Sequence, residues 1–292
     1  MNGSSLNERD LRALRVLRGA AHAGGFSAAE QLLNMTTATI SRQIKSVEER
    51  LGVRLCLRGP QGFELTKAGQ VALKHAEKAL DALDNIRPAV LALQGEITGK
   101  LKIGIIDNTI THPQFNLYQA LNELNTIAPT VHISVYVIPK GGVMRALLDH
   151  EIDIAIEGMH ERNPSLNYKH LFNEKASIYR LKSLNKQIKL PIITRREHII
   201  TNRIFKTLNL EAGPEANSVE AVAILIASGK CCGILPIHYA KSLSQSISLC
   251  RIENAPSIEV EFNAVTDPRR ELPLCAEKFL EILLERCEMN KK

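Results

Sequence analysis

The stretch between residues 36 and 52 constrains the fold most, because its apolar side chains recur with helical spacing. The four apolar residues, separated by four, three and four positions, are Ile40, Ile44, Val47 and Leu51. They form one narrow stripe along a helix that turns by about 100° per residue. Thr36 or Thr37 can cap the start of this helix, and Gly52 is suited to end it. The pattern predicts a helix that packs on a small core through one side only.

The face opposite this stripe carries basic side chains, and its residues near the start of the helix are small. It carries Ala38, Arg42, Lys45 and Glu49, with Ser41 on one flank and Thr39 and Ser46 on the other. Small residues let a helix approach base edges, Arg42 can reach a guanine edge or a phosphate, and Lys45 can reach a phosphate. N–H groups at the helix start are expected to be free for a phosphate oxygen. An ordinary solvated face is the alternative, and the flanking elements argue against it.

These flanking elements have the order of a winged helix-turn-helix. The predicted elements are a helix over 11–24, a short helix from Ser27 to Leu33, the helix described above, two strands over 53–58 and 63–65 joined by a turn at 59–62, and a long helix from Thr66 to about Leu93. Ser27 and Glu30 have the spacing of a capping box. Asn34 and Met35 make the tight turn, and the two short strands make the wing.

Several segments of this region resemble the LysR-type transcriptional regulators in order and spacing. They are Phe26-Ser27-Ala28-Ala29-Glu30, Ile40-Ser41-Arg42-Gln43-Ile44, Leu51-Gly52-Val53-Arg54-Leu55, Arg58, and Leu65-Thr66-Lys67-Ala68-Gly69. The resemblance covers almost all of residues 1–70. It implies a regulator that binds double-stranded DNA at a promoter or operator, with RNA polymerase as a further partner.

The resemblance also implies which residues contact DNA. Those expected to face it are Thr37, Ala38, Ser41, Arg42 and Lys45 on the third helix, and Arg58 and Gln61 on the wing, near the minor groove or backbone. Two departures from the family pattern stand out. Cys56 replaces the usual wing Phe, which affects local packing. Only a short polar stretch, 182–189, joins two apparent strands of the second subdomain. The family usually has a longer insertion with a helix there, so one wall of a ligand cleft is left undefined.

Beyond a hinge at residues 95–100 the pattern changes to strands that alternate with helices. Strands are expected over 101–106, 131–138, 152–156, 190–194, 231–235 and 261–265, and helices around residues 117–124, 143–149 and 218–228, from 237, and over 274–287. This alternation predicts a parallel sheet with right-handed crossovers. The fold class is therefore α/β with an all-α-plus-wing N-terminal domain. The resemblance implies a long linker helix and a two-subdomain effector domain like a periplasmic binding protein.

We expect a winged helix-turn-helix domain over 1–66, a linker and dimerisation helix over 67–95, and an effector domain over 99–292. The resemblance implies that subdomain I covers about 99–159 and 260–288, and subdomain II about 160–259. Leu73, Leu80 and Leu83 form a stripe on the linker helix that the small winged domain cannot cover. The stripe predicts a homodimer, and the resemblance extends this to a homotetramer.

Polar residues and glycines at the C-terminal strand ends mark a candidate effector site, because ligands of open parallel sheets bind beyond those ends. The candidates are Asn108, Thr109, Thr111, Lys140, Gly141, Glu157 and Thr194. Most of these groups can donate hydrogen bonds, which favours an anionic small molecule. Asp107 and Glu157 oppose an anion if they face the cleft. Ordinary loop chemistry is the alternative, since Asn, Gly and Pro favour turns.

Composition adds a few limits. The net charge of +6 and the pI of about 9.0 permit nucleic-acid binding. The polar N-terminal segment and the lack of a long apolar run predict a cytoplasmic protein without membrane association. The six cysteines form no Cys-x-x-Cys pair, and we expect neither a metal nor a cofactor. Adjacent Cys231 and Cys232 leave redox control, or control without a ligand, as the alternative.

Two other classes of protein fit less well. The sequence has no Gly-x-x-x-x-Gly-Lys loop, no His-Glu-x-x-His and no nucleophile elbow, and its nine histidines are scattered. We therefore expect that the chain is not an enzyme. Asp153 lies in an apolar strand and is expected to be structural. A free solute-binding protein would have a secretory signal and no winged domain.

Overall fold

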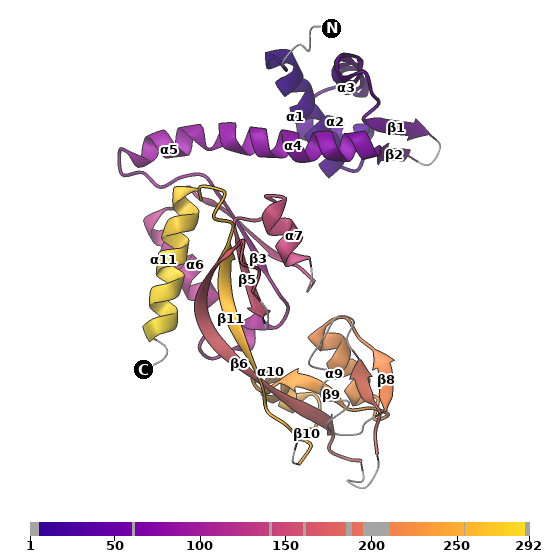
Figure 1. Cartoon of the computed structure of the whole chain (residues 1–292), viewed down its shortest axis with the longest axis vertical. Helices are drawn as coiled ribbons and strands as arrows, with labels where there is room; N and C mark the ends of the chain where they lie inside the picture. Colours follow the sequence, from indigo (N-terminus) through magenta and orange to yellow (C-terminus); the bar gives the residue numbers. More distant parts are fainter. Residues whose placement is uncertain are drawn as a thin grey trace. The chain divides into compact units, whose positions relative to one another are not determined.

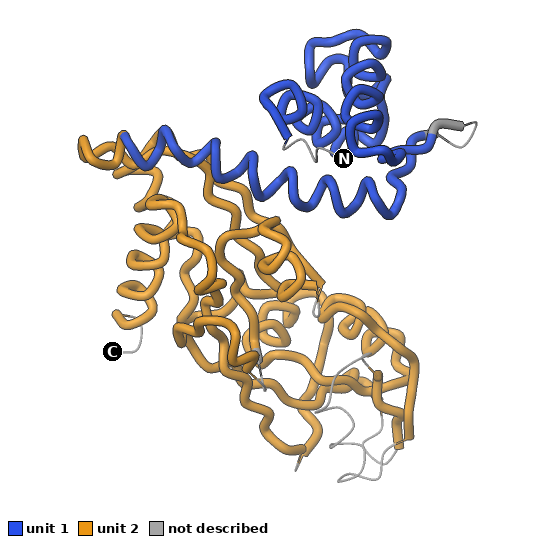
Figure 2. The backbone as a smooth tube through the Cα atoms, turned by 45° about the horizontal axis from the view of Figure 1, so that its top comes forward, with its two compact units in different colours: residues 1–90 blue, residues 91–292 orange. Residues whose placement is uncertain are grey.

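The computed structural model describes residues 6–59, 62–139, 142–159, 162–184, 189–194, 211–253 and 255–289. The chain divides into two compact units, Met1–Val90 and Leu91–Lys292 (Figure 2). Unit 1 contains helices and a short two-stranded ribbon, and unit 2 contains the large sheet. Each unit has a hydrophobic core of its own.

Unit 1 has the predicted order of three helices, a two-stranded wing and a further helix (Figure 1). Its elements are α1 (Glu8–His22), α2 (Phe26–Leu33), α3 (Thr37–Leu51), β1 (Cys56–Gly59), β2 (Gly62–Leu65), α4 (Lys67–Asp84) and α5 (Ile86–Ala92). The side chains of Thr36 and Thr66 cap α3 and α4 by accepting a backbone N–H three residues further on. Gly52 ends α3 in the left-handed conformation, as expected.

The start of α2 differs from the expected one. The helix begins at Phe26, Gly25 is its cap residue, and no side chain of the described residues caps it. Ser27 and Glu30 therefore do not form the expected capping box. The Glu30 carboxylate instead reaches forward to α3, where the backbone N–H and the hydroxyl of Thr37 both donate to it. Two donors at one place outweigh the single backbone N–H that a capping box would offer.

The core of unit 1 lies where the apolar stripes of its helices meet. Its members include Leu14, Leu17, Ile40, Ile44, Val47, Leu55 and Ala76. The predicted stripe of α3 is thus buried except for Leu51, which is 41% exposed at the helix end. Gly69 brings α4 against the wing: an added Cβ would lie 1.8 Å from the carbonyl oxygen of Leu55. Only glycine permits this approach.

The expected long linker helix is interrupted. It is wrong as one helix from Thr66 to Leu93, because α4 ends at Asp84 and α5 begins at Ile86. Pro88 explains the break, since it has no N–H for the carbonyl of Asp84 and its ring crowds that carbonyl. Arg18 of α1 contacts the end of α4 through Asp81, at 3.4 Å.

Exposure along the linker also corrects the predicted dimer stripe. Leu80 is fully buried within the single chain, Leu73 is half-buried, and Leu83 is 40% exposed. Leu80 is therefore not available to a second chain. The exposed apolar residues of this segment are Val71, Leu83, Ile86, Val90 and Leu93.

Unit 2 is built on a large mixed sheet. Its elements are β3 (Lys100–Ile105), η1 (Thr109–Thr111), α6 (Leu117–Ile127), β4 (His132–Val137), α7 (Val143–Leu148), β5 (Ile154–Met159), β6 (Asn167–Leu181), β7 (Ile192–Thr194), β8 (Ala212–Glu215), α9 (Val219–Ala227), β9 (Gly233–Pro236), α10 (Ile237–Ser242), η2 (Leu243–Gln245), β10 (Leu249–Arg251), β11 (Ile258–Thr266) and α11 (Leu274–Met289). Every predicted strand and helix of this region is present, whereas β8, β10 and the bounds of β6 were not predicted.

The sheet is parallel only in part. Its strand order is β10-β6-β11-β5-β3-β4, with β9 also paired to β6. β3 runs parallel to β4 and β5 as predicted, but β11 is antiparallel to both β5 and β6. The chain leaves subdomain I along β6 and returns along β11, so these two strands run in opposite directions. β7 and β8 form a separate parallel pair.

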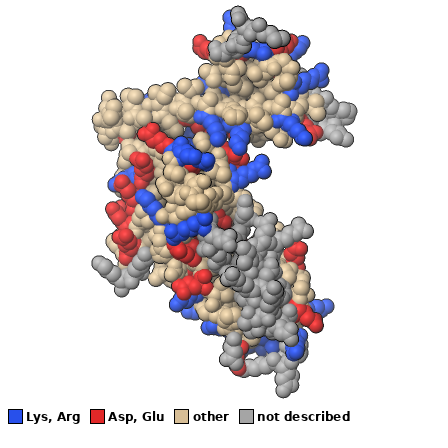
Figure 3. Space-filling view, viewed as in Figure 1, with Lys and Arg blue, Asp and Glu red and all other residues tan. Residues whose placement is uncertain are grey.

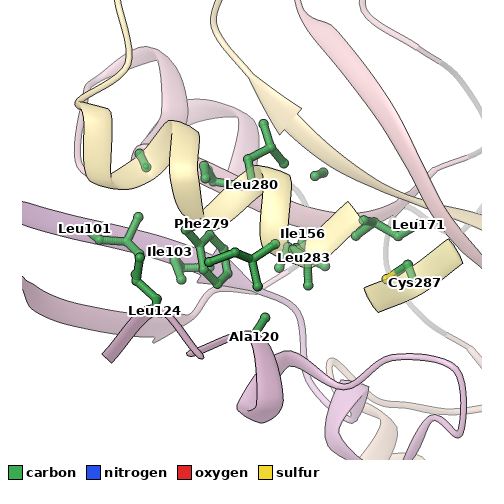
Figure 4. Close-up of a cluster of buried hydrophobic side chains, with 14 of the residues drawn as sticks. Leu101, Ile103, Ala120, Leu124, Ile156, Leu171, Phe279, Leu280, Leu283 and Cys287 are labelled. Carbon is green, nitrogen blue, oxygen red and sulfur yellow. The ribbon is translucent and has the colours of Figure 1, made fainter. Parts of the chain in front are cut away.

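Separate cores support the two subdomains. In subdomain I, α6 and α11 pack on one face of the sheet, where Leu101, Ile103, Ile156, Phe279 and Leu283 meet (Figure 4). The helix α7 covers the other face. In subdomain II, α9 packs against β9 and α10. The long strands β6 and β11 connect the two regions (Figure 1).

A buried ion pair in subdomain I joins the residue before β5 to Arg270. Asp153 precedes β5, accepts a hydrogen bond from the backbone N–H of Lys102 at 2.8 Å, and contacts Arg270 at 3.0 Å. Both of its carboxylate oxygens are therefore engaged in structural contacts. This agrees with the structural role expected for Asp153.

Candidate nucleic-acid interface and effector site

The polar face of α3 is exposed, as predicted. Ala38, Arg42 and Lys45 are exposed, and Thr37 and Ser41 are half-buried. The Lys45 ammonium lies 3.6 Å from the carboxylate of Glu49, one turn further along. A pair this exposed contributes little to stability, so Lys45 can exchange its partner for a phosphate.

On the face drawn in Figure 3, Lys and Arg side chains lie near the wing end of unit 1, and acidic side chains gather over α11 of unit 2.

Carboxylates on the protein side hold α3 in place. Glu48 accepts hydrogen bonds from the backbone N–H groups of Leu55, at 2.7 Å, and Cys56, at 3.2 Å. Arg50 lies 3.1 Å from the buried carboxylate of Asp10 in α1. The first contact fixes the wing to α3, and the second fixes the end of α3 to α1. These contacts orient the exposed face without using any of its side chains.

The start of α3 is capped more fully than expected. Thr37 donates its N–H and its hydroxyl to Glu30, and Thr36 accepts the N–H of Thr39 at 3.3 Å. The hydrogen bonds from Thr37 lower the pKa of Glu30 below its ordinary value, so it stays a carboxylate. The expectation of free N–H groups for a phosphate is therefore wrong for Thr37 and Thr39. The chain supplies its own acceptors there.

The wing is described only in part. Its strands pair with Cys56 opposite Leu65 and Arg58 opposite Phe63. Cys56 is buried in the core of unit 1, where the family pattern has Phe. Gln61 and the side chain of Arg58 lie outside the described residues.

The loop after β3 contacts subdomain II directly. The carboxylate of Asp107 accepts a hydrogen bond of 2.7 Å from the backbone N–H of Val219, the first residue of α9. Asn108 has a left-handed backbone, with φ of 65°, and its buried Nδ2 has no partner among the described residues. Thr109 is buried. The N-terminus of α9 is thus already occupied by a carboxylate of the same chain.

A second contact joins the same loop to α10. The Thr111 hydroxyl lies 2.8 Å from Nδ1 of His238, and Nε2 of His238 lies 3.0 Å from the carboxylate of Glu174 on β6. His112 stacks on Phe172, with ring centroids 4.0 Å apart. Burial, and secondarily the charge of His238, lower the pKa of His112 to about 4. His112 is therefore neutral at physiological pH.

The remaining predicted effector residues are placed elsewhere or are not described. Thr194 ends β7 and donates to the carbonyl of Pro214 at 3.4 Å. Glu157 is buried in β5, opposite Asn263 of β11. Lys140 and Gly141 lie outside the described residues. The structure therefore brings Asp107 and Thr111 to the junction of the subdomains.

Sequence reasoning missed His112, Glu174 and His238. His238 follows the end of the predicted strand at 231–235, so the strand-end rule that selected Asn108 also pointed to it. Glu174 could not be found in this way, because it lies in the interior of β6 and not at a strand end.

The adjacent cysteines are poorly suited to redox chemistry. Cys231 and Cys232 are both buried. Burial raises the pKa of both thiols, that of Cys232 to about 11. A protonated, buried thiol reacts slowly with oxidants, so these observations disfavour the redox alternative.

Along the described parts of the chain, none of the helices is long and apolar enough to cross a membrane.

Comparisons with known proteins identify the family. Residues 11–70 match the model of the bacterial regulatory helix-turn-helix protein, lysR family, and residues 94–288 match the LysR substrate binding domain. The transcriptional activator BauR of Pseudomonas aeruginosa is 28% identical over 247 residues, which are 80% of this chain and 81% of BauR. The crystal structure of CbnR, a LysR family transcriptional regulator, superposes with a TM-score of 0.67 at 21% identity, covering 95% of this chain and 99% of CbnR. CbnR bound to its target DNA gives a TM-score of 0.66 at 21% identity, with 94% and 99% covered.

Fold and matched models together define a DNA-binding transcriptional regulator with an attached ligand-binding domain, and not an enzyme. The chain belongs to the LysR family. The likeness to solved structures confirms the predicted fold class, a winged helix-turn-helix followed by a two-subdomain domain like a periplasmic binding protein.

Proposed function

We propose that α3 enters the major groove of a promoter or operator and reads it through Arg42. The observation that carries this proposal is that Arg42 is exposed on a helix that three carboxylates, those of Asp10, Glu30 and Glu48, orient from the protein side. Lys45 binds a phosphate in place of Glu49. Ala38, Ser41 and Thr37 permit the close approach, and the wing residues Arg58 and Gln61 contact the flanking backbone or minor groove.

We further propose that a small molecule bound between the subdomains controls this activity. Asp107 and Thr111 both link the loop after β3 to subdomain II. An effector that enters this junction has to replace or extend those links. The set of donors at this edge, which includes Nδ2 of Asn108 and the α9 N–H groups, suits an anionic group that competes with Asp107.

We propose that the linker mediates association between copies of the chain. The exposed apolar residues of α5 and its end, Ile86, Val90 and Leu93, suit pairing with a second copy in a homodimer. Pairing would bring two α3 helices to two half-sites, and a homotetramer is the next level proposed. A regulator of this kind acts in the cytoplasm, where promoter DNA and RNA polymerase are found.

The decisive experiment measures binding of the full chain to duplex DNA. Arg42→Ala is expected to weaken specific binding by about 1–3 kcal/mol, because a base contact is lost. Lys45→Ala is expected to weaken all sequences alike and to reduce the salt slope by about one unit. Arg145→Ala removes the same charge from α7 in unit 2 and serves as the matched control. If both α3 variants bind like the control variant while remaining folded, α3 does not contact DNA.

A further inference from the structure

The hydroxyl of Thr37 is already oriented by the protein. Thr37 is the first residue of α3, and Glu30 of α2 accepts both its N–H and its hydroxyl. Glu30 is ionised, because these hydrogen bonds lower its pKa. An ionised carboxylate can only accept hydrogen bonds. The hydroxyl proton of Thr37 must therefore point toward Glu30.

This orientation limits what Thr37 can offer to another molecule. A threonine hydroxyl has one donor and two acceptor lone pairs. With the proton directed at Glu30, the half-buried Thr37 presents only an acceptor oxygen and a methyl group. The neighbouring hydroxyls of Thr36 and Thr39 lie 2.9 Å apart and bond to each other. Thr37 is thus an acceptor at the leading end of the helix that is proposed to enter DNA.

An acceptor distinguishes the bases in the major groove. Adenine presents its N6 amino group there and cytosine its N4 amino group, and both are donors. Guanine and thymine present only acceptors on their hydrogen-bonding edges. Every base pair contains one base of each kind, so reversing a pair moves the donor to the opposite strand. An acceptor-only hydroxyl held against one strand gains a hydrogen bond where that strand carries adenine or cytosine, and it faces an acceptor where that strand carries guanine or thymine.

We propose that Thr37 selects an amino-bearing base, adenine or cytosine, at one position of each half-site, and that Glu30 is the positioning residue that fixes this choice by holding the hydroxyl proton. The proposal rests on the proposed entry of α3 into the major groove. It differs from a simple capping role for Glu30. A cap would affect the stability of α3 and binding to all sequences alike, whereas a held proton affects one base position.

The test is selection from a random-sequence duplex DNA library by the full chain, followed by sequencing. The wild type is expected to prefer adenine or cytosine at one position that Thr37→Val specifically levels, by between about twofold and tenfold, the range of one net hydrogen bond. Glu30→Ala frees the hydroxyl to donate and is expected to admit guanine or thymine at that same position. Glu30→Gln keeps an acceptor oxygen and is expected to keep the wild-type preference.

Glu49→Ala is the matched control, because it removes a carboxylate from the exposed side of α3. It should change binding to all sequences without altering any one position. The proposal is overturned if Thr37→Val leaves every base preference intact. It is also overturned if, at the position that Thr37→Val levels, a folded Glu30→Ala variant still rejects the reversed base pair or a folded Glu30→Gln variant loses the wild-type preference. If Glu30→Ala fails to fold, Thr37→Val and Glu30→Gln still decide the matter. A wild type that enriches no sequence would instead overturn the proposed function, and Arg42→Ala reports on that separately.

Discussion

His112 is a buried imidazole whose proton affinity depends on folding. It packs on Phe172, and its pKa falls from an ordinary 6.5 to about 4 because burial disfavours the charged ring. Below pH 6.5 the unfolded chain binds a proton that the folded chain does not, so stability rises with pH between about 4 and 6.5. Neutral His112 makes its full contribution to the free energy of unfolding above pH 6.5, and this contribution is lost as the pH falls toward 4.

We predict that His112→Phe flattens this dependence. The phenyl ring keeps the stacking on Phe172 and cannot titrate, so lowering the pH from 7 to 5 should cost the variant about 2 kcal/mol less unfolding free energy than the wild type. Denaturant unfolding at both pH values measures the difference. His132→Gln, at an exposed position on β4, should behave like the wild type. Equal pH dependence in wild type and His112→Phe would show that His112 is not the group responsible.

The position of a residue could be predicted from the sequence where a single local pattern determines the face on which it lies. Arg42 and Lys45 follow from the helical period of α3 alone, and the structure places both on the exposed face. The partner of Glu30 could not be predicted, since the carboxylate had two choices, its own helix start or α3. His238 and Glu174 lie 64 positions apart in the sequence, and no local rule relates them.

The linker is the element whose structure departs most from expectation. Pro88 divides it into α4 and α5, and the two parts differ in exposure. Leu80 of α4 is fully buried, whereas Val90 of α5 is 54% exposed. A helical period gives the relative directions of side chains, but it cannot show that α1 covers α4 through pairs such as Arg18–Asp81.

We predict that Val90→Asp weakens self-association by about tenfold or more, because a charge would enter the proposed apolar contact between copies. Light scattering across a concentration series measures the dissociation constant. Leu80→Asp should instead lower the unfolding temperature, because it buries an unpaired charge within one chain. Ile224→Asp, on the exposed side of α9, is the control. An unchanged dissociation constant for Val90→Asp would place the dimer contact elsewhere.

Strands were predicted well where one face or both faces are apolar. The bounds of β6 were not predicted because residues 167–181 mix apolar with charged positions and hold no turn signal that marks a start. Its first half is largely exposed and its second half is buried. No single period describes both halves, so the pattern indicated a strand that ends before residue 182 but not where it begins.

At the scale of the whole molecule, Asp107 bears on the anionic effector that we propose. Its carboxylate occupies the N–H of Val219 that a ligand carboxylate would use. We predict that a screen of small carboxylates and amino acids by thermal shift finds a ligand, and that Asp107→Asn binds an anionic hit about tenfold more tightly, because a like charge is removed. Calorimetry gives the dissociation constants.

Glu271→Gln removes the same charge at an exposed position and should leave the affinity unchanged. A hit that binds Asp107→Asn and the wild type equally would show that its anionic group lies away from α9. Control of DNA binding also requires that the ligand prefer one arrangement of the subdomains, since equal affinity for two arrangements shifts neither.

The pairing of β6 has a mechanical consequence. Residues 167–176 of β6 pair with β11, and residues 176–181 pair with β9 and β10. One strand, β6, therefore belongs to hydrogen-bonded ladders in both subdomains, and the register of its ladder with β11 shifts between Phe262 and Asn263. A change of angle between the subdomains therefore has to bend the paired strands β6 and β11, because these strands connect the two subdomains. The energy of such bending rises roughly with the square of the deformation, so small changes of angle cost little and large ones are strongly opposed.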